Sequence, residues 1–153
     1  MVDIFASVEH PIAVHVNRGK NWLTKQIQPI NQRLLVVDIA AAIVNDETTS
    51  LAGIENVHSL EVKPESEAVR LSFADFVCYA VTEEMFAQQN DEEVSTGLWL
   101  RIFSKSFFLD FVGHTTWATS DFPGQLVHYQ INTLDHTVNV VTANPPEILK
   151  LSR

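Results

Sequence analysis

Residues 68–82 read AVRLSFADFVCYAVT, in which large apolar side chains alternate with other residues over almost the whole stretch. Six of them fall on one parity that only Asp75 interrupts: Val69, Leu71, Phe73, Val77, Tyr79 and Val81. A period of two is typical of a strand with one buried face, because successive side chains point to opposite sides of a sheet. We therefore predict a half-buried strand over residues 68–82, long enough to bend or bulge near Asp75.

Other segments on both sides of this stretch also favour strands. Branched apolar residues over 34–44 predict a buried strand, although the alanines at 40–42 would equally suit a helix. The remaining short segments are predicted to be a helix at 21–28, a loop at 45–56, a strand at 57–62, a polar connection at 83–93 and a strand at 98–103. Strands joined by short links predict an α+β fold with a mostly antiparallel sheet, and residues 1–153 are expected to form one domain.

One amphipathic helix is predicted at residues 104–114, with Ser104 as its N-cap. Its apolar residues recur at spacings of three and four and are expected to form one face: Phe107, Phe108, Phe111 and Val112. Phe111 is placed at the centre of this face and is therefore expected to be a core residue.

The C-terminal part of the chain predicts a β-hairpin, formed by alternating segments at 126–132 and 136–142 with a short link between them. His128 and His136 lie on its two strands. If the turn is centred between Leu134 and Asp135, His128 pairs with Val141 and the two rings point to opposite faces. If it is centred on Leu134, the rings share a face but stand roughly 13 Å apart. Because zinc holds its nitrogen ligands at about 2.0–2.1 Å, neither register predicts a metal site.

The same hairpin supplies an alternative ligand site, composed of His128, Tyr129, Asp135 and His136. Histidine beside carboxylate can act as an acid–base pair, so this site would belong to a small-molecule binding protein or a hydrolase. The chain lacks the Gly-x-Ser-x-Gly turn that exposes a hydrolase serine, so no catalytic residue is assigned. Its five glycines occur singly and form no phosphate-binding loop, and no cofactor is expected.

The negative charge of the chain is concentrated in its middle third. Residues 46–93 contain twelve acids against Lys63 and Arg70, a net charge of −10, whereas the whole chain has a formal charge of −9. Such a surface repels nucleic acid and anionic membranes and attracts basic proteins. We therefore expect a basic protein partner and no binding to nucleic acid or membrane.

Several features predict a soluble, cytoplasmic protein. Cys78 is the single cysteine, so an intramolecular disulfide is excluded, and its apolar neighbours indicate a buried, inert thiol. The first five residues lack the basic and apolar regions of a secretory signal. The longest apolar run, residues 34–44, is too short to span a membrane.

The acidic connection at 83–93 is the candidate partner-binding segment. Its proposed contact residues are Glu83, Glu84, Met85, Phe86, Asp91, Glu92 and Glu93. Met85 and Phe86 would serve as apolar anchors inside a ring of carboxylates, which would accelerate the encounter with a basic partner. The simpler alternative is a solvated loop without a partner.

Part of the chain resembles a group of small uncharacterised bacterial proteins, some of them immunity proteins of polymorphic toxin systems. The resemblance is carried by the C-terminal 55–85 residues, through the segments 101–106, 108–112, 127–129 and 134–136. It implies an α+β fold in a bacterial, cytoplasmic protein and transfers no catalytic residue.

These observations lead to one main hypothesis and two alternatives. The main hypothesis is a non-enzymatic interaction protein, with an immunity protein that neutralises a basic toxin as its most concrete form. The first alternative is a small-molecule binding or hydrolytic enzyme with its site at the hairpin histidines. The second is a structural subunit that works as a homo-oligomer.

Overall fold

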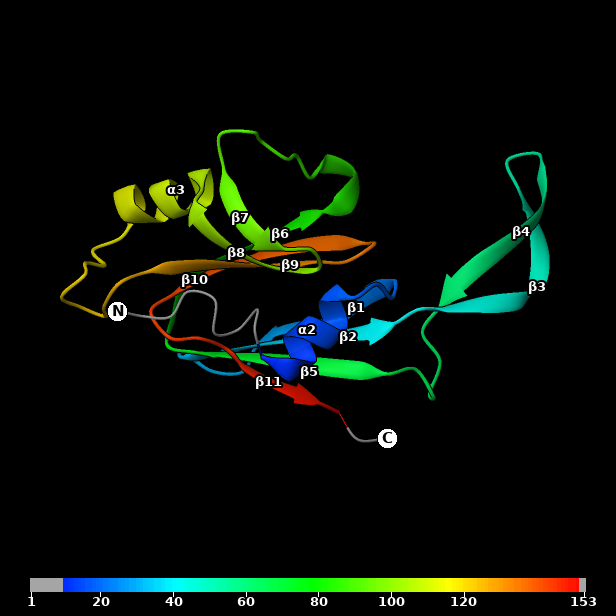
Figure 1. The fold of residues 1–153 in the computed structure, drawn as a ribbon, viewed down its shortest axis with the longest axis horizontal. Helices are drawn as coiled ribbons and strands as arrows, with labels where there is room; N and C mark the ends of the chain where they lie inside the picture. The colour runs from blue at the N-terminus through cyan, green and yellow to red at the C-terminus, as the bar shows by residue number, and fades with distance from the viewer. Residues whose placement is uncertain (1–9, 152–153) are drawn as a thin grey trace.

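The computed structural model describes residues 10–151, so the prediction about a secretory signal lies outside the described residues. Two antiparallel sheets pack face to face, and two helices lie against the assembly (Figure 1). The strands are β1 (Trp22–Pro29), β2 (Leu34–Ala41), β3 (Ile43–Leu51), β4 (Ile54–Glu61), β5 (Ala68–Ala74), β6 (Phe76–Glu83), β7 (Val94–Gly97), β8 (Leu100–Lys105), β9 (Val127–Asn132), β10 (His136–Thr142) and β11 (Glu147–Lys150). The helices are α2 (Pro11–Asn17), α3 (Phe107–Thr115) and the single 3₁₀ turn η1 (Glu84–Phe86). The prediction of a mostly antiparallel α+β domain is confirmed.

The first sheet has the strand order β1-β2-β5-β11, and the second has the order β6-β10-β9-β8-β7. β3 and β4 form a separate two-stranded hairpin that projects from the rest of the molecule (Figure 1). Within residues 10–151, no helix is long and apolar enough to cross a membrane.

The bend predicted at Asp75 is the point where the chain passes from one sheet to the other. Asp75 has φ of 55°, a left-handed conformation that ends β5, and its N–H is bonded to the carbonyl of Arg33. β5 then pairs with β2, whereas β6 pairs with β10. The prediction of one continuous strand over 68–82 is therefore wrong, because the bend divides it into two strands of different sheets.

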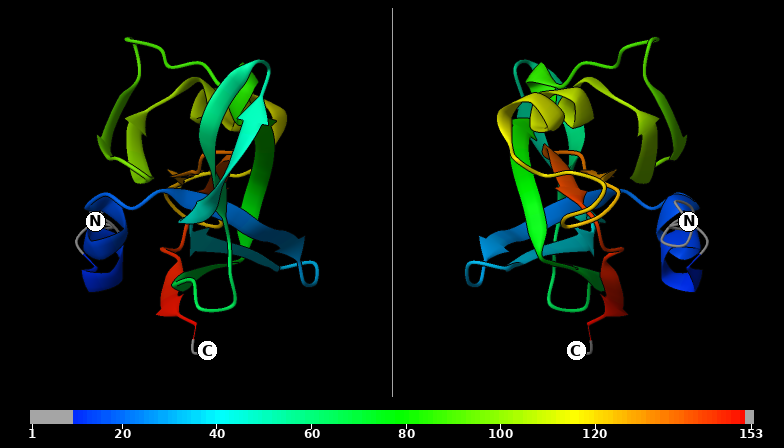
Figure 2. Two further views of the ribbon diagram at one scale, coloured as in Figure 1. Left: turned by 90° about the vertical axis from the view of Figure 1, so that its right-hand side faces the viewer. Right: turned by 90° about the vertical axis from the view of Figure 1, so that its left-hand side faces the viewer.

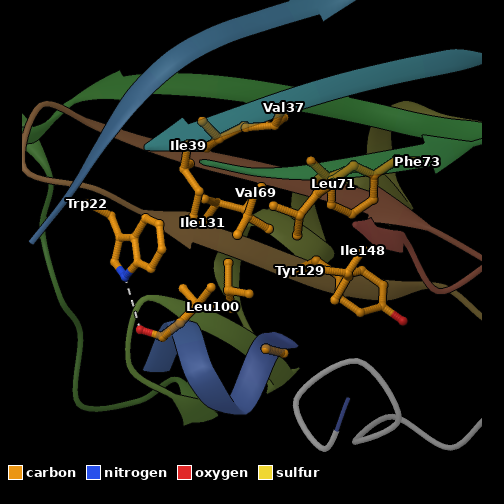
Figure 3. Packing of buried hydrophobic residues seen from close by; sticks show 14 of the residues in the cluster. Trp22, Val37, Ile39, Val69, Leu71, Phe73, Leu100, Tyr129, Ile131 and Ile148 are labelled. Atoms are coloured by element: carbon orange, nitrogen blue, oxygen red, sulfur yellow. Dashed lines mark hydrogen bonds between the residues drawn. The ribbon is translucent and has the colours of Figure 1, made fainter. Parts of the chain in front are cut away.

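The core lies between the two sheets (Figure 3). Val69, Leu71 and Phe73 of β5 face the second sheet, and the Phe73 ring lies 5.9 Å from that of Tyr129. Trp22 of β1 is fully buried, and its indole N–H donates to the carbonyl of Val16 at 3.1 Å. That bond fastens α2 to the edge of the core.

Three predictions in the first half of the chain are wrong. The segment predicted as a helix at 21–28 lies almost entirely in strand β1 (Trp22–Pro29), because it pairs along β2 and so satisfies its backbone groups in a ladder. Residues 45–56, predicted as a loop, belong to the β3–β4 hairpin. The predicted strand at 34–44 divides at Ala42, where its last two residues enter β3.

The helix near residue 104 is present, but it begins later than predicted. Ser104 and Lys105 extend β8, and Ser106 is the N-cap, its Oγ accepting the N–H of Leu109 at 3.0 Å. The buried side of α3 is formed by Val112 with the half-buried Phe108 and Leu109.

The prediction that Phe111 is a core residue is wrong. Phe107 and Phe111 are 51% and 53% exposed. Phe108, Leu109 and Val112 are three and four residues apart, just as Phe107, Phe108 and Phe111 are. The side of the helix that carries Leu109 and Val112 packs against the sheet, and Phe107 and Phe111 face outward.

Candidate functional site

The acidic loop, residues 83–93, connects β6 to β7 along one side of the five-stranded sheet (Figure 1). Glu83 ends β6, and the next three residues form η1. Met85 and Phe86 are each 72% exposed. The N–H of Glu84 donates to the carbonyl of Asp135 at 3.1 Å, so η1 is fastened to the turn between β9 and β10.

Open hollows lie on both sides of η1, and Glu84 contributes to each. The first, of about 670 Å³, has residues 87–91 as a wall and the outer face of β8 and β9 as its floor. The second, of about 660 Å³, combines apolar and acidic side chains from β6, η1 and the β9–β10 turn: Val81, Glu83, Glu84, Met85, Leu134, Asp135 and His136. Val81, Met85 and Leu134 are all exposed, so this second hollow offers apolar surface among carboxylates.

Most of the acids in the middle third form no ion pair in the described chain. Among the residues that the structure describes, ion pairs involve only Glu67 and Asp75 of the twelve acids at 46–93. The five acids of the loop therefore form no ion pair within residues 10–151, and their charge acts mainly on the surrounding solvent.

Glu93 differs from the other loop acids because it has a structural bond. Its Oε2 accepts the N–H of Phe107 at 3.0 Å, at the beginning of α3, where negative charge is favoured. Within residues 10–151, the side chains of Asp91 and Glu92 make no such contact, although the N–H of Glu92 donates to Oδ1 of Asn90 at 3.0 Å. Asp91 and Glu92 are thus the carboxylates that can be changed without disturbing a helix.

Arg101 is the one lysine or arginine among the described residues that line the first hollow. Its Nε and Nη2 donate to Ser95 Oγ at 3.2 and 2.6 Å, and its guanidinium lies 5.1 Å from the centre of the Phe103 ring. The hydroxyl and the ring hold this side chain in one position on the floor.

His128, one of the alternative ligand residues, lies under α3 in a fully bonded network. Its Nδ1 is 2.7 Å from Ser106 Oγ, its Nε2 is 2.7 Å from Asn139 Oδ1, and Gln130 Nε2 donates to the same oxygen at 2.9 Å. Because Ser106 Oγ also accepts the N–H of Leu109, its hydroxyl hydrogen is available for His128 Nδ1. This arrangement assigns the neutral tautomer with hydrogen on Nε2.

Burial lowers the pKa of His128 to about 4, with the Asn139 bond opposing the shift and the charge of Arg101 adding to it. The Phe103 ring stacks on the imidazole at 4.4 Å, and the residue is only 1% exposed. Ser106 is buried as well. A serine hydroxyl hydrogen-bonded to a neutral histidine is an arrangement that can activate a nucleophile. Here both residues are buried, so a substrate could not reach the hydroxyl.

The other three alternative ligand residues lie elsewhere. Tyr129 belongs to the core between the sheets. Asp135 Oδ1 accepts bonds from the N–H of Thr24 at 2.9 Å and the hydroxyl of Thr133 at 2.8 Å. His136 Nδ1 is 3.1 Å from Asp135 Oδ2, outside hydrogen-bond geometry.

The hairpin register is the one that pairs His128 with Val141. His128, Tyr129 and the Asp135–His136 pair consequently occupy three separate places, and the structure does not bring the predicted alternative site together. Within residues 10–151, no group of three or more His, Cys, Asp or Glu side chains is arranged to hold a metal ion.

Sequence reasoning missed the neighbours of the acidic loop. Glu83 pairs with His136 across β6 and β10, which places the β9–β10 turn beside η1. That pairing joins residues about fifty positions apart, and neither strand alone indicates it. If the sequence had predicted that β6 pairs with β10, the candidate surface would also have included Val81, Leu134 and Asp135.

Comparison of the chain with protein-family models, with curated proteins and with solved structures gives no match.

Proposed function

We propose that the protein is a non-enzymatic interaction domain that binds a basic protein partner through the acidic loop. Its contact surface comprises Glu83, Glu84, Met85, Phe86, Asp91 and Glu92, together with the adjoining Val81 and Leu134. The observation that carries this proposal is the proximity of two large apolar side chains, each 72% exposed, to carboxylates that form no ion pair in the described chain.

The two kinds of side chain have different roles in such an interface. Carboxylates attract a basic partner over distance and orient the encounter, whereas Met85 and Phe86 contribute affinity when they are desolvated. Methionine suits this position because its flexible side chain adapts to an irregular partner surface.

The most concrete form of the proposal is an immunity protein that neutralises a basic toxin in the bacterial cytoplasm, as the resemblance in the C-terminal part implies. A nuclease toxin would present lysine and arginine side chains that normally bind phosphate. The loop carboxylates would occupy those cations and exclude the nucleic acid. The enzymatic alternative has less support, because its four residues do not share one site.

The partner can be sought by affinity capture with the full chain. The wild type is compared with a Met85→Ala/Phe86→Ala variant and with a matched control, Trp117→Ala/Phe122→Ala, which truncates two other highly exposed aromatic residues. We expect a basic protein to be retained by the wild type and the control but at least about tenfold less by the loop variant, because hot-spot residues contribute about 2 kcal/mol or more. Equal retention by both variants, or loss in the control alone, would move the interface away from the loop.

A further inference from the structure

We propose that the β3–β4 hairpin, residues 43–61, is a second docking element, which we call the arm, and that it captures a basic extended segment of a protein partner by strand addition at the free edge of β4. This inference concerns a different part of the surface from the acidic loop and would stand if the loop did not bind.

The arm projects from the body and has little of its own core. β3 and β4 pack mainly against each other, and Figure 1 shows them standing away from the two main sheets at one end of the molecule. The left view of Figure 2 looks at this end, so that the hairpin faces the viewer. A two-stranded hairpin is marginally stable alone in water, so a third strand would add to its stability.

The arm exposes apolar side chains that nothing in the described chain covers. Leu51 and Ile54, which pair with each other near its tip, are 66% and 65% exposed. Val44 and Leu60 form a second exposed cross-strand pair nearer the body. A strand placed beside β4 would bury part of this surface in addition to pairing its backbone.

The edge of β4 is better suited to pairing than the edge of β3. β3 has three residues between its pairs with Leu60 and His58, where β4 has only Ser59, so β3 is bulged. Bulges twist an edge and hinder further pairing. β4 has its own extra residue nearer the tip, where Glu55 and Asn56 lie opposite Ser50 alone and Asn56 has φ of 60°. Val57 to Glu61 contain no extra residue, and within the described chain no strand pairs with their outer edge.

The charge of the arm indicates which kind of strand can pair with the edge of β4. The arm contains Asp46, Glu47, Glu55 and Glu61 and no lysine or arginine, a net charge of −4. Two arms brought edge to edge would combine eight carboxylates without a cation, which disfavours a second copy of this chain. An extended segment with alternating lysine or arginine would instead place its cations near these acids.

The test uses the full ¹⁵N-labelled protein and two acetylated, amidated octapeptides of equal charge, (Lys-Val)₄ and (Lys-Pro)₄. Alternating prolines, with φ fixed near −65°, hold the second peptide in the threefold polyproline II conformation, in which its lysine N–H groups do not line up along one edge. The second peptide therefore retains the charge but does not pair as a strand. We expect (Lys-Val)₄ to shift the amide resonances of residues 57–61 and slow their hydrogen exchange at least about fivefold, with (Lys-Pro)₄ binding about tenfold more weakly.

Two charge variants sharpen the result. Glu47→Gln/Glu55→Gln should weaken (Lys-Val)₄ binding about threefold, whereas the control Asp121→Asn/Glu147→Gln, which removes two charges elsewhere, should leave it within about 1.5-fold. Neither pair takes part in an ion pair among the described residues.

Four outcomes would overturn the inference. Equal binding of the two peptides would reduce it to unspecific charge attraction, and an absence of shifts in residues 43–61 would exclude the arm as a site. If the protein self-associates and Leu60→Thr abolishes this, the strand that pairs with β4 belongs to a second copy of the chain. Shifts confined to residues 83–93 would also reject the arm while favouring the acidic loop, so failure of the two proposals can be told apart.

Discussion

Replacing Phe73 with alanine is expected to lower the free energy of unfolding by about 3–5 kcal/mol, the range for a buried phenylalanine that leaves a cavity. Phe73 is fully buried in β5, two residues before the bend at Asp75, and its ring contacts Tyr129 of the opposite sheet. The change removes apolar contact where the two sheets meet. Because the sheets are packed against each other along their length, they cannot move together locally to fill the cavity. Urea-induced unfolding followed by tryptophan fluorescence measures the loss.

Phe86→Ala is the matched control, since the same atoms are removed from a largely exposed position. It should change the free energy of unfolding by no more than about 0.5 kcal/mol. A loss below about 1 kcal/mol for Phe73→Ala would show that the space between the sheets is not a packed core.

Acidification from pH 7 to pH 4 is expected to reduce the free energy of unfolding by about 3 kcal/mol through His128 alone. Its pKa is about 4 in the folded protein against 6.5 in the unfolded chain, so the unfolded state binds more protons between these values. Stability contributed by the neutral imidazole is therefore complete above pH 6.5 and is lost as the pH falls toward 4.

Protonation of carboxylates also lowers the free energy of unfolding as the pH falls. A variant is therefore needed to separate the contribution of His128. For Glu67, burial would raise the pKa, but bonds from Lys20 and His15 outweigh it and lower the pKa. Asp135 also has a lowered pKa: burial opposes the shift, and bonds from Thr24 and Thr133 overcome that effect. His128→Gln should be less stable at pH 7 and should show a smaller decrease toward pH 4, whereas His114→Gln, at an exposed position, should follow the wild type. An unchanged pH slope in His128→Gln would mean that His128 titrates in the folded protein as it does in water.

The parts of the fold that the sequence predicted are those with strong local periodicity. Alternation over 68–82 and over the β9–β10 hairpin identified strands, and a polar break located the bend at Asp75. The missed parts lack a clear alternation of apolar side chains. The large apolar side chains of β1 are Trp22, Leu23 and Ile27, whose spacing fits a helix as well as a strand until pairing with β2 is taken into account. In the arm, the strand predicted at 57–62 corresponds to most of β4, but β3 is mainly polar and so shows little alternation of apolar side chains.

The candidate site was predictable to a similar degree. Its acids and the two apolar anchors follow from the composition of residues 83–93. Assigning Glu93 to the contact surface overlooked its bond to the beginning of α3, which depends on where that helix starts. The hairpin histidines were grouped because they are close in sequence, but the alternation of a strand places His128 and Tyr129 on opposite faces.

The proposed function rests on long-range attraction by the acidic loop, and binding kinetics test it most directly. The basic protein retained in the capture experiment is immobilised, and association is measured at low and physiological salt for wild type, Asp91→Lys/Glu92→Lys and the control Asp121→Lys/Glu147→Lys. Glu93 is left intact because its Oε2 accepts the N–H of Phe107 at the beginning of α3. All four substituted acids lack ion pairs within the described chain, so the two variants change the net charge equally.

We expect the loop variant to associate about tenfold more slowly at low salt, with a weaker salt dependence and a dissociation rate within about twofold of the wild type. The control should associate at nearly the wild-type rate. An association rate and salt dependence in the loop variant equal to those of the wild type would contradict the proposal and leave residues 83–93 as a solvated connection between β6 and β7.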